Sequence, residues 1–332
     1  MNRILIIGGY GHVGQKIARR LIAAGKSVTI AGRDAGKAAA AAKRLGCQGA
    51  LDLSRPESWE GPLAGAEVVI CCLDTESADF AGAVLSRGLA YLDISATDQV
   101  LRRIEALDGL AQEKGGLAVL SVGLAPGLTN LLVREARERC PEATRFRIGV
   151  LLGLGDSHGP AAIDWTLGSL APLGRGDIQP LRFGRDRRAQ PTIPFDFADQ
   201  HSLMRRGYRR VETRLALASP LIASWSLRLL AWMAGRPGLR KALAASMPYL
   251  RVGSDRTALV VEAFTADGSA PALRLTLEGR QEAEVTALVA AEVALRLPQL
   301  SARGVRHLDE LLRYDDLRPV LAGEGIAREG RG

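Results

Sequence analysis

The chain has no apolar run long enough to cross a lipid bilayer. Its longest apolar stretch, residues 215–227, is bounded by Arg214 and Arg228 and falls short of the about 20 residues that a membrane-spanning helix requires. The N-terminus, Met1-Asn2-Arg3-Ile4, leads directly into a strand-like pattern, with no feature of a secretory signal. We therefore expect a cytoplasmic protein.

Cysteine is scarce, and several reactive motifs are missing. There are four cysteines, and no C-x-x-C pair occurs among Cys47, Cys71, Cys72 and Cys140. This pattern argues against a disulfide framework or a zinc site and favours buried free thiols in a reducing compartment, so we expect no metal. The nucleophile motif G-x-S-x-G is also absent, which argues against covalent hydrolysis.

Aromatic residues are few, at 5%, so the core is expected to consist mainly of Ala, Leu, Val and Ile. Hydrophobic residues make up 47% and charged residues 24% of the chain, which is typical of a globular domain. The 332 residues suffice for one large domain or two domains of ordinary size.

Short apolar runs alternate with helical patterns over the first ~125 residues, which predicts a parallel α/β sheet. The expected helices cover residues 12–25, 35–46, 77–88 and 97–115. The expected strands cover residues 3–9, 27–32, 47–53, 66–73, 89–95 and 117–123. Such a succession predicts a complete doubly wound, or Rossmann, nucleotide-binding sheet.

The pattern changes after residue 125. Alternating runs at 256–264 and 272–280 predict a hairpin, and we interpret residues 175–215 as irregular with short strand-like pieces. A strand is expected at 144–153, and helical patterns cover residues 126–140, 160–170, 219–235, 236–247, 282–297 and 307–325. We place a domain boundary near residue 125.

The segment Gly-Gly-Tyr-Gly-His-Val-Gly, residues 8–14, contains the spacing Gly9-x-Gly11-x-x-Gly14. It follows a strand and opens a helix, the context required of a dinucleotide-binding fingerprint. The glycines permit a tight turn, close approach of a pyrophosphate, and close packing of helix and strand. We expect the helix N-terminus to face the phosphates, with Tyr10, His12 and Val13 completing the loop.

The end of the second strand indicates which dinucleotide binds. An acid at this place holds a ribose 2′-hydroxyl and repels a 2′-phosphate, but here the chain has Gly32 followed by Arg33. A guanidinium fork suits a phosphate and also stacks on adenine. We therefore predict NADPH or NADP⁺ rather than NAD⁺, and assign the neighbouring Asp34 to capping of the next helix.

Further cofactor contacts are expected from loops at the carboxyl ends of the strands. The candidates are Asp52, Leu53, Leu73, Thr75 and Ser95.

Three segments resemble the saccharopine dehydrogenase-like family of NADP-dependent oxidoreductases. They are the nucleotide loop with its helix at 6–21, Tyr91-Leu92-Asp93 in the fifth strand, and a Gly-x-x-Pro-Gly-x-x-Asn turn at 123–130. The resemblance is clearest over residues 1–135. It implies a nucleotide domain at 1–125, a second α+β domain with a mixed sheet at 126–302 that holds substrate and forms a homodimer, and a segment at 303–330 that packs back on the nucleotide domain.

Basic residues are concentrated in the second domain. Sixteen basic and six acidic residues lie between Arg175 and Arg256, a local excess of +10 against +8 for the whole chain. Three interpretations remain open: arginines that bind substrate carboxylates, a surface that meets an anionic membrane through a helix bearing Trp225 and Trp232, and an ordinary solvated face. Nucleic acid is not an expected partner, since no recognised motif accompanies the charge.

Reduction of an imine or a polarised alkene needs a proton donor near the substrate. We rank His201 with Asp199 first, then His158 and Asp164, as acid, base or positioning candidates; an exposed loop or a purely structural role stays open for each. The leading hypothesis is an NADPH-dependent reductase of a C=N or C=C bond in a small, carboxylate-bearing substrate. The alternatives are a non-catalytic NADP(H) sensor and a reductase of a lipid- or polyketide-like intermediate.

Overall fold

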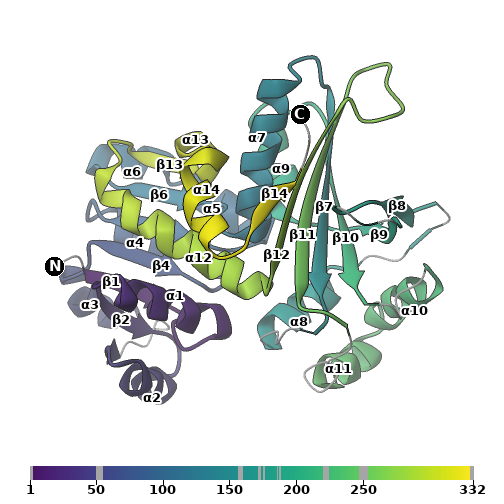
Figure 1. Cartoon of the computed structure of the whole chain (residues 1–332). Helices are drawn as coiled ribbons and strands as arrows, with labels where there is room; N and C mark the ends of the chain where they lie inside the picture. Colours follow the sequence, from purple (N-terminus) through teal and green to yellow (C-terminus); the bar gives the residue numbers. More distant parts are fainter. Residues whose placement is uncertain are drawn as a thin grey trace. The chain divides into compact units, whose positions relative to one another are not determined.

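The computed structural model describes residues 3–49, 55–155, 160–170, 173–174, 176–184, 186, 188–219, 224–246 and 253–329. The chain forms two compact units (Figure 1). Unit 1 comprises residues 1–128 and 283–313, and unit 2 comprises residues 129–282 and 314–332.

Unit 1 is built on a seven-stranded sheet whose strand order is β13-β6-β5-β4-β1-β2-β3, with every neighbouring pair parallel. Without β13, this is the order 3-2-1-4-5-6 of a doubly wound dinucleotide-binding fold. The strands are β1 (Arg3–Ile7), β2 (Ser27–Ala31), β3 (Gln48–Gly49), β4 (Val68–Cys71), β5 (Ala90–Asp93), β6 (Leu117–Leu120) and β13 (Gly304–His307). The helices are α1 (His12–Ala23), α2 (Ala35–Leu45), η1 (Pro56–Ser58), α3 (Glu60–Ala64), α4 (Asp79–Leu85), α5 (Asp98–Glu105), α6 (Asp108–Lys114), η2 (Leu124–Leu128), α12 (Glu282–Arg296), η4 (Leu297–Gln299) and α13 (Leu308–Leu311).

The central strands of unit 1 are buried on both faces. All four residues of β4 and of β6 are buried, as their continuous apolar sequences predict for a parallel sheet covered by helices. In Figure 1, α12 runs beside α1, and Glu284 on α12 pairs with Lys16 and with Arg20, the latter at 3.1 Å. Burial opposes ionisation of Glu284, but hydrogen bonds from both cations outweigh it and hold the pKa of Glu284 below its ordinary value. This ion-pair cluster fixes the helix that follows the nucleotide loop.

Unit 2 contains a mixed sheet of seven strands in the order β14-β12-β11-β7-β10-β9-β8. Only β7 and β10 are parallel neighbours, and the other pairs are antiparallel. The strands are β7 (Arg145–Gly153), β8 (Gln179–Leu181), β9 (Gln190–Pro194), β10 (Val211–Ala218), β11 (Arg256–Phe264), β12 (Leu273–Arg280) and β14 (Ala327–Glu329). The helices are α7 (Thr129–Arg139), α8 (Pro160–Gly168), α9 (Ala198–Arg205), α10 (Ser224–Ala234), α11 (Pro237–Ser246) and α14 (Tyr314–Gly323). The expected α/β class, with a Rossmann sheet and a second mixed sheet, is confirmed.

Two expected elements differ in the structure. The single helix expected at 97–115 is two helices, α5 and α6, separated at Ala106 and Leu107. Asp108 begins α6, and its Oδ1 accepts hydrogen bonds from the Val305 amide at 2.8 Å and from Arg306 at 3.1 Å, so a tertiary contact fixes the break. The region expected to be irregular at 175–215 contains α9 and the first part of β10, which pairs with β7 along eight residues.

The last part of the chain also divides differently from our expectation. Most of α12 belongs to unit 1, although we expected residues up to 302 in the second domain. Conversely, α14 and β14 belong to unit 2, because β14 pairs with β12 through Thr276 to Glu278. Within the segment 303–330, β13 and α13 belong to unit 1, where β13 pairs in parallel with β6.

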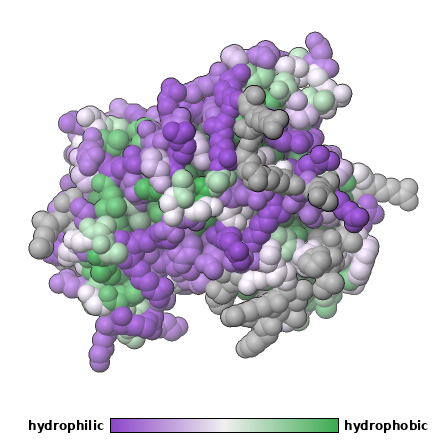
Figure 2. Space-filling view, in the orientation of Figure 1, coloured by the Kyte–Doolittle hydropathy of each residue, from purple (hydrophilic) through white to green (hydrophobic). Residues whose placement is uncertain are grey.

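On the face shown in Figure 2, hydrophilic residues predominate and apolar residues gather in small groups. Within the described residues, the structure has no helix with the length and apolar character needed to cross a membrane.

Candidate functional site

The turn between β1 and α1 is shaped by glycines that leave no room for side chains. A Cβ at Gly14 would lie 2.4 Å from the Gly8 carbonyl oxygen and 2.8 Å from Gly9 Cα. A Cβ at Gly9 would lie 2.6 Å from the Ile30 side chain and 2.9 Å from the Ile6 carbonyl oxygen. Gly8 itself has φ of +75°, which L-residues rarely adopt. The turn is therefore as tight as a dinucleotide-binding loop requires.

Helix α1 begins at the carboxyl end of β1 without a side-chain cap. Its N-cap is Gly11, which has no side chain to satisfy the first-turn amides. The first turn carries no acidic residue, so nothing there competes with an anion for the positive end of the helix dipole. A helix terminus with these properties suits a pyrophosphate. The loop before and at this terminus consists of Gly9, Tyr10, Gly11, His12, Val13 and Gly14.

Tyr10 lies against the end of β2. A Cβ at the buried Gly32 would lie 2.3 Å from Tyr10 Cε1 and 3.1 Å from the Tyr10 hydroxyl oxygen, so the ring occupies the space that a side chain at 32 would need. Arg33 follows and is exposed. Asp34 caps α2: its Oδ1 accepts a hydrogen bond from the Lys37 amide at 2.9 Å, which is the first cause of its lowered pKa. The acid beside Arg33 thus has a structural function at the helix start.

The carboxyl ends of β4 and β5 bring several polar side chains together. Asp74 accepts hydrogen bonds from the hydroxyls of Ser95 and Thr97. The Thr75 carbonyl accepts one from Arg103 at 3.2 Å. Leu73 contacts the start of the nucleotide loop, since a Cβ at Gly8 would lie 2.9 Å from its Cδ2. Leu73, Thr75 and Ser95 therefore lie at the same sheet edge as the glycine loop, whereas Asp52 and Leu53 lie outside the described residues.

A buried carboxyl lies just below this edge. Asp93, at the end of β5, is fully buried and accepts hydrogen bonds from the Tyr91 hydroxyl at 2.9 Å and the Ser95 amide at 2.8 Å. Burial raises the pKa of Asp93 to about 7, and the nearby Asp74 acts in the same direction, against the two hydrogen bonds. Burial likewise raises the pKa of the neighbouring Cys71 to about 12. Asp93 therefore exchanges its proton near neutral pH, whereas Cys71 stays protonated there.

A second buried chain of hydrogen bonds joins β6, β13 and α5. Ser121 has a positive φ of 57°, and its Oγ lies 2.8 Å from His307 Nδ1. His307 Nε2 lies 3.0 Å from Glu105 Oε1. His307 also begins α13, where its backbone amide donates to Glu310 at 2.7 Å. Because Ser121 and His307 are buried, this chain ties the edge strand β13 to the sheet rather than presenting a nucleophile.

The acid and base candidates from the sequence are not brought together. Asp199 is fully buried, and its Oδ1 accepts hydrogen bonds from Thr213 Oγ1 at 2.8 Å and the Gln200 amide at 2.7 Å. Burial is the largest influence on Asp199 and raises its pKa. His201 is partly exposed, and its Nε2 lies 2.5 Å from Asp196 Oδ1, so its hydrogen bond goes to Asp196 and not to Asp199. Asp164 is exposed on α8, 3.9 Å from Arg240, and His158 lies outside the described residues. In this arrangement Asp199 joins α9 to β10.

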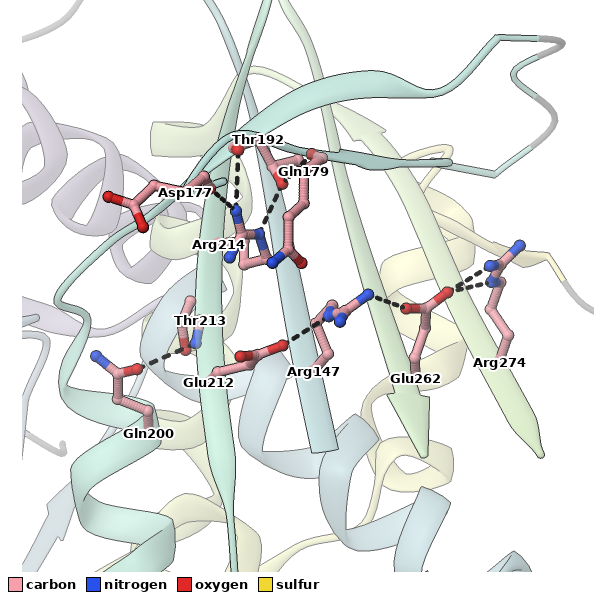
Figure 3. Close-up of polar contacts among 10 residues, drawn as sticks. All are labelled: Arg147, Asp177, Gln179, Thr192, Gln200, Glu212, Thr213, Arg214, Glu262 and Arg274. Carbon is pink, nitrogen blue, oxygen red and sulfur yellow. Dashed lines mark hydrogen bonds and ion pairs between the residues drawn. The ribbon is translucent and has the colours of Figure 1, made fainter. Parts of the chain in front are cut away.

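A row of charged side chains crosses the sheet of unit 2 (Figure 3). Arg147 on β7 lies between Glu212 on β10, at 2.7 Å, and Glu262 on β11, at 3.5 Å. The buried Glu262 also accepts from Arg274 on β12, with 2.9 Å to its Nε. Next to this row, Arg214 is 4% exposed and donates to Thr192 Oγ1 at 2.8 Å and to the Thr192 and Asp177 carbonyls. Burial lowers the pKa of Arg214. The arginines of this row are thus held by partners within the sheet.

An open pocket borders the charged row. Its volume is about 390 Å³, and Arg147, Arg182, Arg274 and Glu262 contribute charged groups to its lining. Arg182 is exposed there, so the pocket offers a guanidinium to an anionic ligand. In the part of the chain that the structure describes, no group of three or more His, Cys, Asp and Glu residues is placed to hold a metal ion.

The sequence pointed to the loop from Leu73 to Thr75, but it assigned no role to Asp74 itself or to the hydrogen bond between Tyr91 and Asp93. The signal for Asp74 was available, because it lies in the loop after β4 and accepts a hydrogen bond from Ser95, which follows β5. The spacing Tyr-x-Asp places both side chains of β5 on one face of the sheet, which brings a phenol and a carboxyl into contact.

Residues 3–97 match the family model described as NADP oxidoreductase, coenzyme F420-dependent. Among curated proteins, none matches the sequence significantly. This family model covers the glycine loop, Arg33 and the edge formed by β4 and β5. The matched residues are fewer than half of the chain, and all of them lie in unit 1.

One solved structure extends the likeness to the whole chain. Saccharopine dehydrogenase (L-Glu forming) from Saccharomyces cerevisiae superposes with a TM-score of 0.67 at 14% identity, over 100% of both chains. A variant of meso-dapdh from Clostridium tetani E88 reaches a TM-score of 0.48 at 17% identity, over 97% of this chain and 100% of that one. A probable dehydrogenase from Thermotoga maritima reaches 0.46 at 11% identity, over 90% and 89%. The first of these shows that both units share the saccharopine dehydrogenase fold, and with the family model it confirms the predicted resemblance.

Proposed function

We propose that this chain, an oxidoreductase with the fold of saccharopine dehydrogenase, is an NADPH-dependent reductase. The proposal rests above all on one observation: an uncapped helix start and a guanidinium flank the carboxyl edge of the same parallel sheet. The first suits a pyrophosphate, and the second suits the 2′-phosphate that distinguishes NADPH from NADH.

The surroundings of Gly32 support the choice of NADPH. The Tyr10 ring fills the position that an acidic side chain at residue 32 would occupy, so the usual carboxylate partner of a ribose 2′-hydroxyl is missing there. The acid that follows, Asp34, already accepts the Lys37 amide as the cap of α2. Arg33 is exposed and carries its charge at the edge where the adenosine is expected to bind.

The test is to titrate NADPH and NADH into purified Arg33→Ala by calorimetry. We expect a loss of about 1.5–3 kcal/mol for NADPH, the value of a hydrogen bond to a charged group, and almost no change for NADH. Lys43→Ala is a matched control, because Lys43 is an exposed cation of the neighbouring helix α2. Equal losses for both dinucleotides, or the same loss in the control, would reject the assignment of Arg33.

The reaction that we propose is hydride transfer from the nicotinamide to a C=N or C=C bond of a small substrate that bears a carboxylate. The excess of arginine between residues 175 and 256 supports an anionic substrate, and Arg182 beside the 390 Å³ pocket is one exposed candidate to bind it. Asp93 and Tyr91 are further candidates, as proton reservoirs at the sheet edge, since the pKa of Asp93 is about 7.

The reaction is tested with a panel of amines mixed with keto acids. Turnover is measured as a decrease in NADPH absorbance. Turnover of an amine and keto-acid pair supports imine reduction. Tight binding of NADPH without turnover across the panel, and across enoyl substrates, would favour the non-catalytic sensor instead.

A second candidate is reduction of a lipid- or polyketide-like intermediate, which the mainly apolar lining of one pocket in unit 2 favours. The pocket has a volume of about 50 Å³, so it admits only a small part of an acyl chain. The lining residues are Leu152, Leu154, Ile163, Thr166, Leu167, Leu170, Ile193, Leu215, Leu217, Leu230 and Glu282. Mass spectrometry of the purified protein tests this candidate, since a co-purified lipid supports it.

A further inference from the structure

Helix α10 is apolar on two opposite faces. Leu227, Ala231 and Ala234 are buried against unit 2. On the other face, Trp225 is 69% exposed, Leu229 47% and Trp232 53%. These three residues are spaced i, i+4 and i+7, so they form a stripe along one side of the helix. Large apolar side chains gathered in this way mark a surface that binds something.

The surroundings of the stripe are basic. Residues 224–246, which form α10 and α11, contain four cations and no acid: Arg228, Arg236, Arg240 and Lys241. Arg240 lies 3.9 Å from Asp164 on α8, the acid that faces this helix pair. The guanidinium of Arg236 lies 3.6 Å from the centre of the Trp232 ring and donates to the Trp232 carbonyl at 3.2 Å. No described carboxylate pairs with Arg228, Arg236 or Lys241, so positive charge flanks the exposed tryptophans.

We infer that the α10–α11 surface, defined as Trp225, Leu229 and Trp232 with Arg228, Arg236 and Lys241, binds a bilayer that contains anionic lipid. Tryptophan has an apolar ring and a polar N–H, which suits the boundary between headgroups and acyl chains. Cations beside the rings attract anionic headgroups. Because α10 has only 11 residues, it would lie in the interface rather than cross the membrane.

The charge also argues against a second copy of the chain as the occupant. In a two-fold symmetric dimer, the same patch meets itself. Arg228, Arg236 and Lys241 of one copy would then face the same cations of the other, and no acid of residues 224–246 would offset them. An anionic bilayer is complementary to both features of the surface, the apolar stripe and the cations.

Co-sedimentation with vesicles tests this inference independently of any dinucleotide binding. The full-length protein is mixed with vesicles of phosphatidylcholine alone, or of phosphatidylcholine with phosphatidylglycerol. We expect binding to the mixed vesicles that falls as salt is raised, and a blue shift of tryptophan emission on binding. The double variant Trp225→Ser/Trp232→Ser and the triple variant Arg228→Ser/Arg236→Ser/Lys241→Ser should each lower the partition coefficient at least tenfold.

Two control variants separate the surface from general properties of the chain. Met204→Ser removes another exposed apolar side chain, 40% exposed on α9, and should leave binding unchanged. Arg188→Ser/Arg209→Ser/Arg210→Ser removes three exposed cations of unit 2 elsewhere and should weaken binding less than threefold. Circular dichroism confirms that each variant is folded.

Several results would overturn the inference. One is no binding of the folded wild-type protein to the anionic vesicles at low salt. Another is equal loss of binding in the two sets of charge variants, which would mean that only net charge matters. A third is a wild-type dimer, seen by light scattering, that Trp225→Ser/Trp232→Ser converts to monomer, because a second copy would then cover the stripe.

Discussion

Replacement of Asp93 by Asn should make unit 1 more stable at alkaline pH relative to the wild type. Asp93 is fully buried, and burial raises its pKa from 3.8 to about 7 in the folded protein. Between these values the unfolded chain loses the proton while the folded chain keeps it, so stability falls as the pH rises. By about pH 8, one unit above this pKa, both states are ionised and the loss is nearly complete.

The size of the expected change in the free energy of unfolding follows from the shift in the pKa of Asp93. At 1.36 kcal/mol for each pKa unit, the rise from 3.8 to about 7 corresponds to about 4 kcal/mol over the full range. About 3 kcal/mol of this contribution to the free energy of unfolding remains at about pH 5, and it is lost by about pH 8. Asn at 93 keeps the geometry, because its oxygen accepts from the Ser95 amide and its NH₂ donates to the Tyr91 hydroxyl, which reverses one hydrogen bond.

The assay is urea unfolding of Asp93→Asn and of the wild type at matched pH values, followed by circular dichroism. Other titrating groups contribute equally to the free energy of unfolding of both proteins, so the difference between the two values cancels them. Asp199 is one such group, since its pKa is also raised. We expect this difference to grow by about 3 kcal/mol in favour of Asp93→Asn from about pH 5 to about pH 8. The exposed Asp79→Asn, on α4, is the control and should show no such trend. A difference that stays constant with pH would refute the reasoning.

Three other substitutions test separate contacts. Gly14→Ala should weaken NADPH binding at least tenfold by calorimetry, because its Cβ would lie 2.4 Å from the Gly8 carbonyl oxygen; unchanged affinity would contradict the assigned loop. Glu262→Gln should cost about 2 kcal/mol in thermal unfolding, since it weakens the charged hydrogen bonds between Glu262 and two arginines; an unchanged melting temperature would show that the row contributes nothing. Asp34→Ala should cost about 1 kcal/mol in urea unfolding through loss of the α2 cap, and a neutral result would rule out that function.

Much of unit 1 could be predicted from sequence, because its signals are local. Continuous apolar runs such as Val68–Cys71 and Leu117–Leu120 identify buried parallel strands, and the glycine spacing identifies the turn into α1. The cap at Asp34 was predicted for the same reason, since capping depends on residues within one turn. Strand β13 was not predicted, because four residues carry little periodicity and pair with β6 from far along the chain.

The candidates in unit 2 show what sequence reasoning lacks. His201 and Asp199 are two residues apart, which suggested a pair, but a helix places such residues on different sides. Asp199 therefore turns inward to Thr213, and His201 turns outward to Asp196. Strand β10 was partly missed because it is buried on both faces and lacks clear alternation. Which loops converge on one site depends on long-range pairing, and no local pattern encodes it.

The parallel pairing of β13 with β6 constrains the order in which the protein can fold while it is being synthesised. Residues 304–307 leave the ribosome only after all of β7 to β12 has been made. Until then the outer edge of β6 has no strand beside it, and Ser121 has no histidine to bond. A ribosome-bound chain that ends before residue 304 therefore exposes a strand edge that the finished protein covers, and such an unpaired edge is prone to pair with other chains.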